Sequence, residues 1–344
     1  MEQDNSLRKL PGTFDAGVMY TLAAVLFAYL GNFLHLAFSN LKLTDDIYVI
    51  FSEAVIIALP PILYAALRRM DIKKTFRLKA PKPLEVLVML LISPIMIIAG
   101  LCAGFIALIL IKKTFGTVLL GGTVTNLMNN GILWSLFIVA VIPAVCEEIL
   151  FRGMIQRGME GLGAGWSIFL SGLLFGLFHF DFQRFAAQAL IGFVAAYAVY
   201  RTGSIFNGMI LHFMNNGLLT LVSSLSYQQQ SGDATPMMID PFTFPEFVEM
   251  ANQYGMSVDD FLTQIIIVFA VIMAVALFLI LGLLILLRSI TKPRFEKPVP
   301  VKGSGLGLLA GVPGLALILI VYAALGLTLL GNPVGRELLR ILGI

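Results

Sequence analysis

Long runs of apolar residues, separated by short polar segments, extend along almost the whole chain. A run of about 20 apolar residues is long enough to cross a bilayer as a helix. Nine runs come near this length, at residues 16–38, 47–67, 85–111, 130–151, 164–180, 185–200, 204–225, 261–287 and 304–330. The fifth and sixth runs are short and contain polar residues, so a count of eight is also compatible with the pattern. We therefore predict an all-α fold, a polytopic transmembrane helical bundle of eight or nine spans.

The composition supports this class. Hydrophobic residues make up 58% of the chain and charged residues only 12%, whereas a soluble domain carries about 25% charged residues. We predict an integral membrane protein with membrane lipid as a partner and no nucleic-acid partner. The two cysteines, Cys102 and Cys146, lie in apolar runs, where thiols act as small hydrophobic side chains and are inert as nucleophiles.

The distribution of basic residues predicts the orientation. The connector at residues 68–82 is the most basic segment of the chain, and basic loops face the cytoplasm. With nine spans, a cytoplasmic N-terminus places 17 of the 23 Lys and Arg residues inside. We read no cleaved signal peptide in the polar N-terminal segment and predict a plasma-membrane protein. The loop from Ser226 to Asp260 lacks Lys and Arg. It is predicted to lie outside, with a short amphipathic helix at Pro245–Tyr254 and a helix cap at Ser257.

Two adjacent carboxylates, Glu147 and Glu148, interrupt the end of the fourth run. Ionisable groups in hydrocarbon cost several kcal/mol, so they persist where they are paired, hydrated or used. Consecutive helical residues differ in direction by about 100°. Glu148 and Arg152 stand at i and i+4 with the acid first, which favours an ion pair. We therefore predict a structural Glu148–Arg152 pair and an unpaired Glu147 that faces elsewhere.

Polar side chains also occur in the fifth and seventh runs. His179 ends the fifth run, four residues after Phe175, and His212 and Asn216 share one helix face in the seventh run. A carboxylate, two imidazoles and an amide in apolar helices are typical of a water-activating site. Glu147 would be the general base, the histidines would orient water or bind a metal, and Asn216 would stabilise an oxyanion. Phe175 is expected to pack against this site.

Each of these residues, taken alone, has a structural interpretation. A lone histidine in a membrane helix usually makes a helix–helix hydrogen bond, which is how we interpret His35. Together, however, a purely structural interpretation would require four polar residues that each cost free energy in the membrane and serve no function. We therefore favour a functional site.

Three short motifs of the chain resemble those of the CPBP family, which comprises CAAX proteases and bacteriocin-processing enzymes and is also called the Abi family: Glu147-Glu148-x-x-x-Arg152, Phe175-x-x-x-His179 and His212-x-x-x-Asn216. Each motif alone is weak. Three in this order, each at a membrane span, make a strong signal. The resemblance covers roughly Gly131 to Ser226, and the remainder of the chain resembles no family that we can name.

The resemblance implies an intramembrane endopeptidase of the type that removes the C-terminal tripeptide from prenylated CAAX proteins. In that family the first glutamate of the pair activates water and the motif histidines and asparagine complete the site. The implied catalytic residues are therefore Glu147, His179, His212 and Asn216, supported by Glu148, Arg152 and Phe175. The expected partner is a CAAX-like or bacteriocin-type peptide or a lipidated protein.

The metal requirement is open at this point, because the family fits both a metalloprotease and a glutamate-dependent, metal-free description. Zn²⁺ with His179 and His212 among its ligands would suit a catalytic site with one open position. The His-Glu-x-x-His signature of many zinc peptidases is absent from the sequence.

The predicted organisation divides the chain into five parts. They are a polar tail (1–15), an N-terminal transmembrane region (16–129), a CPBP-like catalytic core (130–226), an extracytoplasmic loop (227–260) and a C-terminal transmembrane region (261–344). The main alternative is a non-catalytic membrane binding or immunity protein on the same scaffold. A proton or cation transporter is a further alternative, although no inverted repeat is visible.

One feature of nine regular spans conflicts with a shared site. Glu147 would lie near the cytoplasmic end of the fourth span and His179 near the outer end of the fifth. The two residues can meet if the fourth helix continues past Arg152 toward Met159 and the fifth span is short or tilted. Pro143 favours such irregularity because it removes a helical hydrogen bond.

Overall fold

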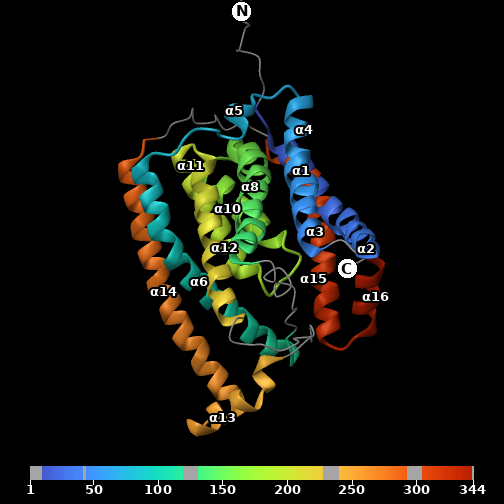
Figure 1. The fold of residues 1–344 in the computed structure, drawn as a ribbon, viewed down its shortest axis with the longest axis vertical. Coiled ribbons are helices and arrows are strands. Elements are labelled where there is room, and N and C mark those ends of the chain that lie inside the picture. The colour runs from blue at the N-terminus through green and yellow to red at the C-terminus, as the bar shows by residue number, and fades with distance from the viewer. Residues whose placement is uncertain (1–9, 42–43, 119–130, 228–239, 293–303, 343–344) are drawn as a thin grey trace, which may run out of the picture.

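The computed structural model describes residues 10–41, 44–118, 131–227, 240–292 and 304–342. These residues form a bundle of helices without a strand (Figure 1), which confirms the all-α fold. Among the described residues, seven helices are long and apolar enough to cross a membrane: Thr13–Asn40, Asp45–Leu67, Pro83–Phe115, Ile132–Leu162, Ile205–Ser224, Val258–Ile290 and Gly305–Leu329. The fifth and sixth predicted runs form two shorter helices between the fourth and fifth of these seven.

The helices of the first half are α1 (Thr13–Val25), η2 (Leu26–Gly31), α2 (Asn32–Asn40), α3 (Asp45–Phe51), η3 (Ser52–Ala58), α4 (Leu59–Leu67), α5 (Ile72–Thr75) and α6 (Pro83–Phe115). Those that follow are α7 (Ile132–Leu136), η5 (Phe137–Val141), α8 (Ile142–Glu148), η6 (Ile149–Gln156), α9 (Arg157–Met159), η7 (Glu160–Leu162), α10 (Ala164–Leu177), α11 (Phe185–Thr202) and α12 (Ile205–Tyr227). The last are η8 (Pro241–Thr243), α13 (Pro245–Gln253), α14 (Val258–Ile290), η9 (Ser304–Gly311), α15 (Val312–Leu329) and α16 (Pro333–Leu342).

One continuous helix, Ile132–Leu162, occupies the middle of the bundle and is called the central helix below. It consists of α7, η5, α8, η6, α9 and η7. The helices α1, α10, α12 and the π-helix η3 pack against it. Outside this core, α14 lies along α6, and α15 packs between α1 and α16 (Figure 1). The central helix is therefore enclosed by elements from both halves of the chain.

The central helix continues well beyond residue 151, where the hydropathy pattern placed its end. Its later polar residues are buried in protein and do not mark a membrane surface. Arg152 pairs with Glu148, the Gln156 amide donates to the carbonyl of Ala196 at 2.8 Å, and Glu160 pairs with Arg77. The continuation toward Met159 is thus confirmed. It makes Glu147 the sixteenth of the 31 residues of this helix, halfway along it.

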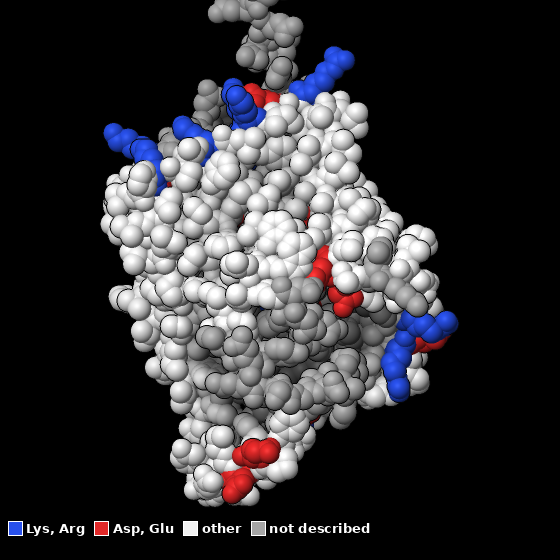
Figure 2. All heavy atoms as spheres, in the orientation of Figure 1, with Lys and Arg blue, Asp and Glu red and all other residues white. Residues whose placement is uncertain are grey.

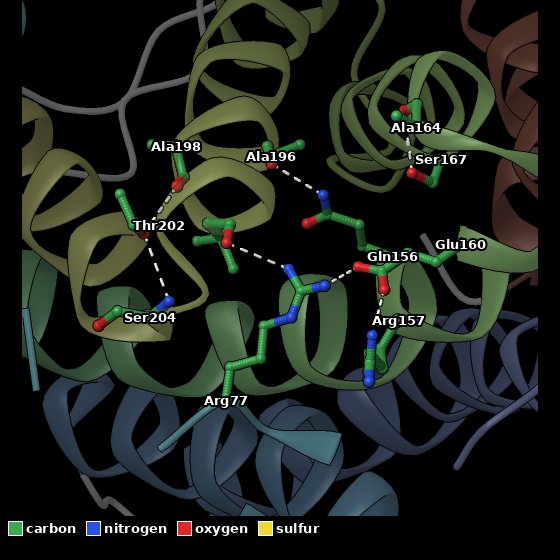
Figure 3. A network of polar contacts seen from close by, with 11 residues as sticks. Arg77, Gln156, Arg157, Glu160, Ala164, Ser167, Ala196, Ala198, Thr202 and Ser204 are labelled. Atoms are coloured by element: carbon green, nitrogen blue, oxygen red, sulfur yellow. Dashed lines mark hydrogen bonds and ion pairs between the residues drawn. The ribbon is translucent and has the colours of Figure 1, made fainter. Parts of the chain in front are cut away.

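A buried polar network lies at the end of the central helix (Figure 3). The Arg77 guanidinium, from the segment between α5 and α6, pairs with one oxygen of Glu160 and donates to the carbonyl of Val199 at 3.1 Å. Arg157 pairs with the other oxygen of Glu160. Burial lowers the pKa of Arg77 to about 9, and repulsion from Arg157 contributes. This network joins the N-terminal region to the central helix and α11.

Charged side chains are unevenly distributed over the surface. Figure 2 shows Lys and Arg gathered at the end of the molecule where α5 lies, a second basic group beside α16, and uncharged side chains over most of the remaining surface in view. An apolar belt of this kind is what a lipid bilayer covers. The protein is therefore an integral membrane protein.

Two details of the predicted outer loop are confirmed. Its amphipathic helix is α13, and the Ser257 hydroxyl accepts from the backbone N–H of Asp260 at 3.2 Å at the start of α14. Residues 228–239 of this loop, like residues 1–9 of the predicted tail, lie outside the described residues.

Candidate active site

The two glutamates of the central helix differ in exposure. They end the segment α8, which lies between the π-helices η5 and η6. The Glu147 side chain is 15% exposed, whereas that of Glu148 is 0% exposed. Helical geometry points consecutive residues in different directions, and here it leaves one carboxylate accessible and the other enclosed. π-Helical segments are frequent at functional sites.

The imidazole of His212, on α12, lies between the two carboxylates. Its Nε2 atom is 4.0 Å from Oε2 of Glu147, and its Nδ1 atom is 3.4 Å from Oε1 of Glu148. The His212 side chain is 3% exposed. The ring is therefore close to both carboxylates, although its Nδ1 makes no hydrogen bond to a described residue.

Glu148 forms the predicted ion pair with Arg152. Nη1 of Arg152 is 2.9 Å from Oε1 of Glu148, and both side chains are 0% exposed. Arg152 also donates to the carbonyl of Gly192 on α11 at 3.1 Å, and its guanidinium carbon lies 4.5 Å from the centre of the Phe175 ring. The pair thus holds α10, α11 and the central helix together, while Glu147 has no such cation beside it among the described ion pairs.

Phe175 organises the two histidines. Its buried ring meets the imidazole of His179 edge-on with ring centres 5.1 Å apart, and that of His212 with centres 5.7 Å apart. The prediction that Phe175 packs against the site is therefore confirmed. The same ring contacts Arg152, so that three polar residues of the motifs surround one aromatic side chain.

His179 lies just past the end of α10. Its Nδ1 atom is 2.9 Å from the carbonyl of Phe175, which can only accept, so this hydrogen bond requires the proton on Nδ1. The next residue, Phe180, has a φ of 53°, a conformation that costs a bulky residue about 1–3 kcal/mol. Its ring stacks on Phe27 with centres 5.4 Å apart, and this packing holds the turn that carries His179. Nothing in the sequence pattern distinguishes Phe180 from an ordinary core residue.

Asn216 braces α12 against the central helix. Its side-chain amide donates to the carbonyl of Val139 at 3.1 Å, and its oxygen accepts from the amide of Asn215 at 3.1 Å. In a regular helix the N–H of residue 143 would bond to the carbonyl of residue 139, but Pro143 has no N–H. Asn216 thus supplies a donor to a carbonyl that the proline leaves without its usual partner.

Gly208 allows α12 to approach the enclosed carboxylate. A Cβ at this position would clash with Oε2 of Glu148 and would lie 2.8 Å from the side chain of Val199. The sequence-based prediction did not include Gly208. A glycine one helical turn before His212 is a weak signal of this close approach.

The side chains do not form a complete set of zinc ligands. Among the described residues, no group of three or more His, Cys, Asp or Glu side chains is arranged to hold a metal ion. The donor set therefore does not fit a catalytic zinc site with three protein ligands, and the geometry does not identify His179 and His212 as metal ligands. Zinc stays a prediction.

A cavity of about 280 Å³ lies beside the site, between α6, α11 and α12. Asp181 and Arg184, which follow His179, line it together with Asn215. Because Asn215 donates to Asn216, this cavity and the glutamate–histidine cluster lie on neighbouring faces of α12.

Comparison with known proteins adds a family to this geometry. Residues 129–218 match the family model described as type II CAAX prenyl endopeptidase Rce1-like. No curated protein and no solved structure matches the chain. The matched stretch is about a quarter of the sequence, and it contains all seven residues of the three motifs. Over residues 129–218, the chain is therefore similar to the Rce1-like type II CAAX prenyl endopeptidases.

Proposed function

We propose that the protein is an intramembrane endopeptidase that hydrolyses a peptide bond of a CAAX-like, membrane-associated peptide or lipidated protein. The observation that carries the proposal is the placement of Glu147. It lies halfway along a membrane-spanning helix, it is the accessible member of the glutamate pair, and it faces His212 Nε2 at 4.0 Å. Its Oε2 atom has no hydrogen-bond partner among the described residues. A partly exposed carboxylate with an unpartnered oxygen is suited to accept a proton.

In this proposal, the ion pair of Glu148 and Arg152 determines which ring nitrogen of His212 carries the proton. Glu148, neutralised by Arg152, lies 3.4 Å from Nδ1 of His212. A proton on Nδ1 then leaves the Nε2 lone pair free on the side of Glu147. Water can be held there by the carboxylate of Glu147 and by Nε2. Glu148 and Arg152 act in this proposal by orienting His212.

Hydrolysis follows from this arrangement. Glu147 takes a proton from the water as its oxygen bonds to the scissile carbonyl carbon. The carbonyl oxygen becomes an oxyanion. Collapse of the tetrahedral intermediate breaks the C–N bond, and the proton held by Glu147 passes to the leaving amine. No covalent enzyme intermediate is required.

Two further residues would stabilise the reacting group. The amide nitrogen of Asn216 carries two hydrogens, and one of them is used by the Val139 carbonyl. The other would donate to the oxyanion. His179, whose Nδ1 donates to the Phe175 carbonyl, would use the lone pair of its Nε2 to accept a hydrogen bond from a backbone N–H of the substrate. In this proposal, catalysis depends on Glu147, His179, His212 and Asn216.

The membrane placement is part of the proposal. The end of the molecule that carries α5 is rich in Lys and Arg (Figure 2). By the positive-inside rule, this end would lie on the cytoplasmic side of the plasma membrane. The N-terminus then lies in the cytoplasm. The substrate would reach Glu147 laterally from the bilayer or from the cytoplasmic side.

The test is cleavage of a fluorogenic CAAX-type peptide, farnesylated and unlipidated, by the purified protein in detergent. Glu147→Gln should lower kcat/KM by about 10²–10⁴-fold, the usual contribution of a general base, at an unchanged unfolding temperature. The matched control is Glu249→Gln, which removes an exposed carboxylate of α13 and should leave cleavage unchanged. Full activity of folded Glu147→Gln would overturn the proposal and favour a non-catalytic binding protein.

The same cleavage assay, run with and without a strong chelator, tests whether the reaction requires a metal ion. The described side chains do not form a three-ligand group, and every proposed step uses the side chains of the protein itself. Activity that is lost with a strong chelator and restored by Zn²⁺ would establish zinc as a cofactor. Unchanged activity would establish the metal-free reaction.

A further inference from the structure

The helices α10 and α11 form a hairpin that ends inside the thickness of the membrane. They pack along each other, and α10 follows the end of the central helix, which the Arg77–Glu160 pair joins to the segment after α5. α10 has 14 residues and is therefore about 21 Å long, whereas the hydrocarbon core of a bilayer is about 30 Å thick. The turn between the two helices, residues 178–184, consequently lies at the depth of the bilayer interior.

This turn carries two charged residues, Asp181 and Arg184. Their side chains are 28% and 54% exposed. Irregular backbone at membrane depth occurs where it is buried in protein or lines a water-filled cavity, and a charged residue there is by default a candidate for function. Both residues line the cavity of about 280 Å³ between α6, α11 and α12, together with Gln183 of the same turn. The turn therefore forms a polar end of a cavity inside the membrane.

The wall that α6 contributes to this cavity is apolar. It includes Leu101 and Phe105, which are about half exposed, and Gly104 between them. A Cβ at position 104 would meet no atom within 4 Å, so the missing side chain leaves this part of the cavity open. Ile191 of α11 and Leu219 of α12 complete the apolar lining. The cavity thus suits a ligand that has apolar groups and one polar end.

The charge at the polar end indicates an anion. Arg184 is the one Lys or Arg among the described residues that line the cavity. Its Nε atom lies 3.4 Å from Oδ2 of Asp181, whose other oxygen accepts the backbone N–H of Gln183 at 2.8 Å. The guanidinium makes no other ion pair among the described residues. Asp181 therefore holds one edge of the guanidinium, and the two Nη groups stay available for two parallel hydrogen bonds to a carboxylate.

The cavity adjoins the candidate active site. The turn that carries Asp181 and Arg184 also carries His179. On the other side, Asn215 lines the cavity and donates to Asn216 at 3.1 Å, the residue proposed to bind the oxyanion. A peptide whose scissile carbonyl lies at Asn216 therefore has its neighbouring residues within reach of the cavity.

A peptide end fits the cavity better than a phospholipid does. A free C-terminus combines apolar side chains with a carboxylate, and a carboxylate at membrane depth needs a cation. Pockets for drug-sized ligands measure about 300–1,000 Å³, so a cavity of about 280 Å³ has room for a segment of a few residues. Two acyl chains with a headgroup would exceed it.

We propose that this cavity binds the C-terminal end of the substrate, with the terminal carboxylate on Arg184 and the last side chains against α6. Arg184 is then a specificity-determining residue, which selects peptides that end a few residues past the scissile bond. The inference rests on the proposed peptidase function, because it assigns a place to the part of the substrate that hydrolysis releases.

Binding is measured without hydrolysis. The probe is trileucine with a fluorophore on its N-terminus, as the free acid and as the C-terminal amide, titrated with the purified protein in detergent. Wild type should bind the acid about 10–100-fold more tightly than the amide, the usual value of a hydrogen bond to a charged group. Arg184→Gln should bind both forms as weakly as the amide. Arg336→Gln, which removes an exposed arginine of α16, is the matched control and should behave as wild type.

The contrary results are distinct. Equal affinity for acid and amide in wild type, no binding of either form, or a preference for the acid that persists in Arg184→Gln would each overturn the inference. A site that binds lysophosphatidic acid through Arg184 but does not bind trileucine would be a lipid site, which also overturns it.

A second pair of variants tests the apolar wall. Gly104→Leu places a side chain in the open space of the cavity and should weaken binding of the trileucine acid about tenfold, the value of one aliphatic side chain in a pocket. Gly282→Leu is the matched control. Gly282 lies in α14, also has open space around it and does not line the cavity. Unchanged affinity in folded Gly104→Leu would place the peptide elsewhere and overturn the inference.

The inference and the proposed function can fail separately. Binding of the acid that depends on Arg184, in a protein that cleaves no CAAX-type peptide, would retain the binding site and count against the proposed function. Cleavage that depends on Glu147 but has the same kcat/KM for substrates ending in a carboxylate and in an amide would retain the peptidase and overturn the role of Arg184.

Discussion

Two buried ionic clusters lie on the central helix and hold opposite proportions of charge. The cluster at its midpoint contains two carboxylates, Glu147 and Glu148, and one guanidinium, that of Arg152, with His212 between the carboxylates. The cluster at its end contains two guanidiniums and one carboxylate, that of Glu160 (Figure 3). Both consist of residue types that are rarely found inside proteins unless they are paired.

The two clusters differ in how far their carboxylate oxygens are satisfied. At the end of the helix, each oxygen of Glu160 has its own guanidinium, and Arg77 also donates to the Val199 carbonyl. At the midpoint, the Oε2 atoms of Glu147 and Glu148 have no hydrogen-bond partner among the described residues. We call the cluster around Glu160 the closed cluster, because both of its carboxylate oxygens are paired, and the cluster around Glu147 and Glu148 the open cluster. The closed cluster joins structural elements, whereas the open cluster retains groups that can react. We therefore assign a structural role to the closed cluster and a catalytic role to the open cluster.

The largest effect on stability is expected from removing the single cation of the open cluster. Arg152→Met leaves Glu148 buried with no guanidinium and should cost about 4 kcal/mol of unfolding free energy, within the range for breaking a buried ion pair. The matched variant is Arg157→Met in the closed cluster. There Glu160 keeps Arg77, so the cost should be about 1 kcal/mol. Thermal unfolding in detergent measures both.

Equal stability losses for Arg152→Met and Arg157→Met would contradict this prediction. Equal losses for the two arginine variants would mean that the number of remaining cations does not determine stability in these clusters. Arg152 would then act through its contacts with Gly192 and Phe175, and the charge argument would fail.

A smaller loss is expected when the anion of the closed cluster is removed. Glu160→Gln leaves Arg77 and Arg157 buried together without a carboxylate, which should cost about 3 kcal/mol. Burial already opposes the charge on Arg77, as its lowered pKa indicates. The folded fraction should keep the wild-type kcat, because the network lies at the end of the helix and contains no reacting group. A fall in kcat at full folding would make Glu160 part of the catalytic machinery and remove the distinction between the clusters.

The residues of the open cluster could be selected from sequence because local spacing determines them. The i and i+4 positions of Glu148 and Arg152 predict their ion pair, which is confirmed. The four-residue spacing of Phe175, in α10, and His179, one turn on and just past the end of α10, brings their rings together. The helical class also follows from hydropathy, since a bilayer requires long apolar helices.

The sequence could not give the partners that meet through tertiary packing. The end of the central helix was misplaced because Glu160 is neutralised by Arg77, 83 residues away in the chain. In the same way, the need for glycine at position 208 follows from the approach of α12 to Glu148.

Asn216 lies at the edge of the open cluster. The smallest predicted effect on stability is that of Asn216→Leu, and this variant shows whether the cluster includes Asn216. The Asn216 amide donates to the Val139 carbonyl, so Asn216→Leu should cost about 1 kcal/mol, the net value of one hydrogen bond. Pro143→Ala restores an N–H that can donate to the same carbonyl. In that background the stability cost of Asn216→Leu should largely disappear. The loss of kcat should remain, because the oxyanion still lacks its donor. A double-mutant cycle in unfolding temperature and kcat measures both. Recovery of kcat in the Pro143→Ala background would show that Asn216 only braces α12, and the open cluster would then end at His212.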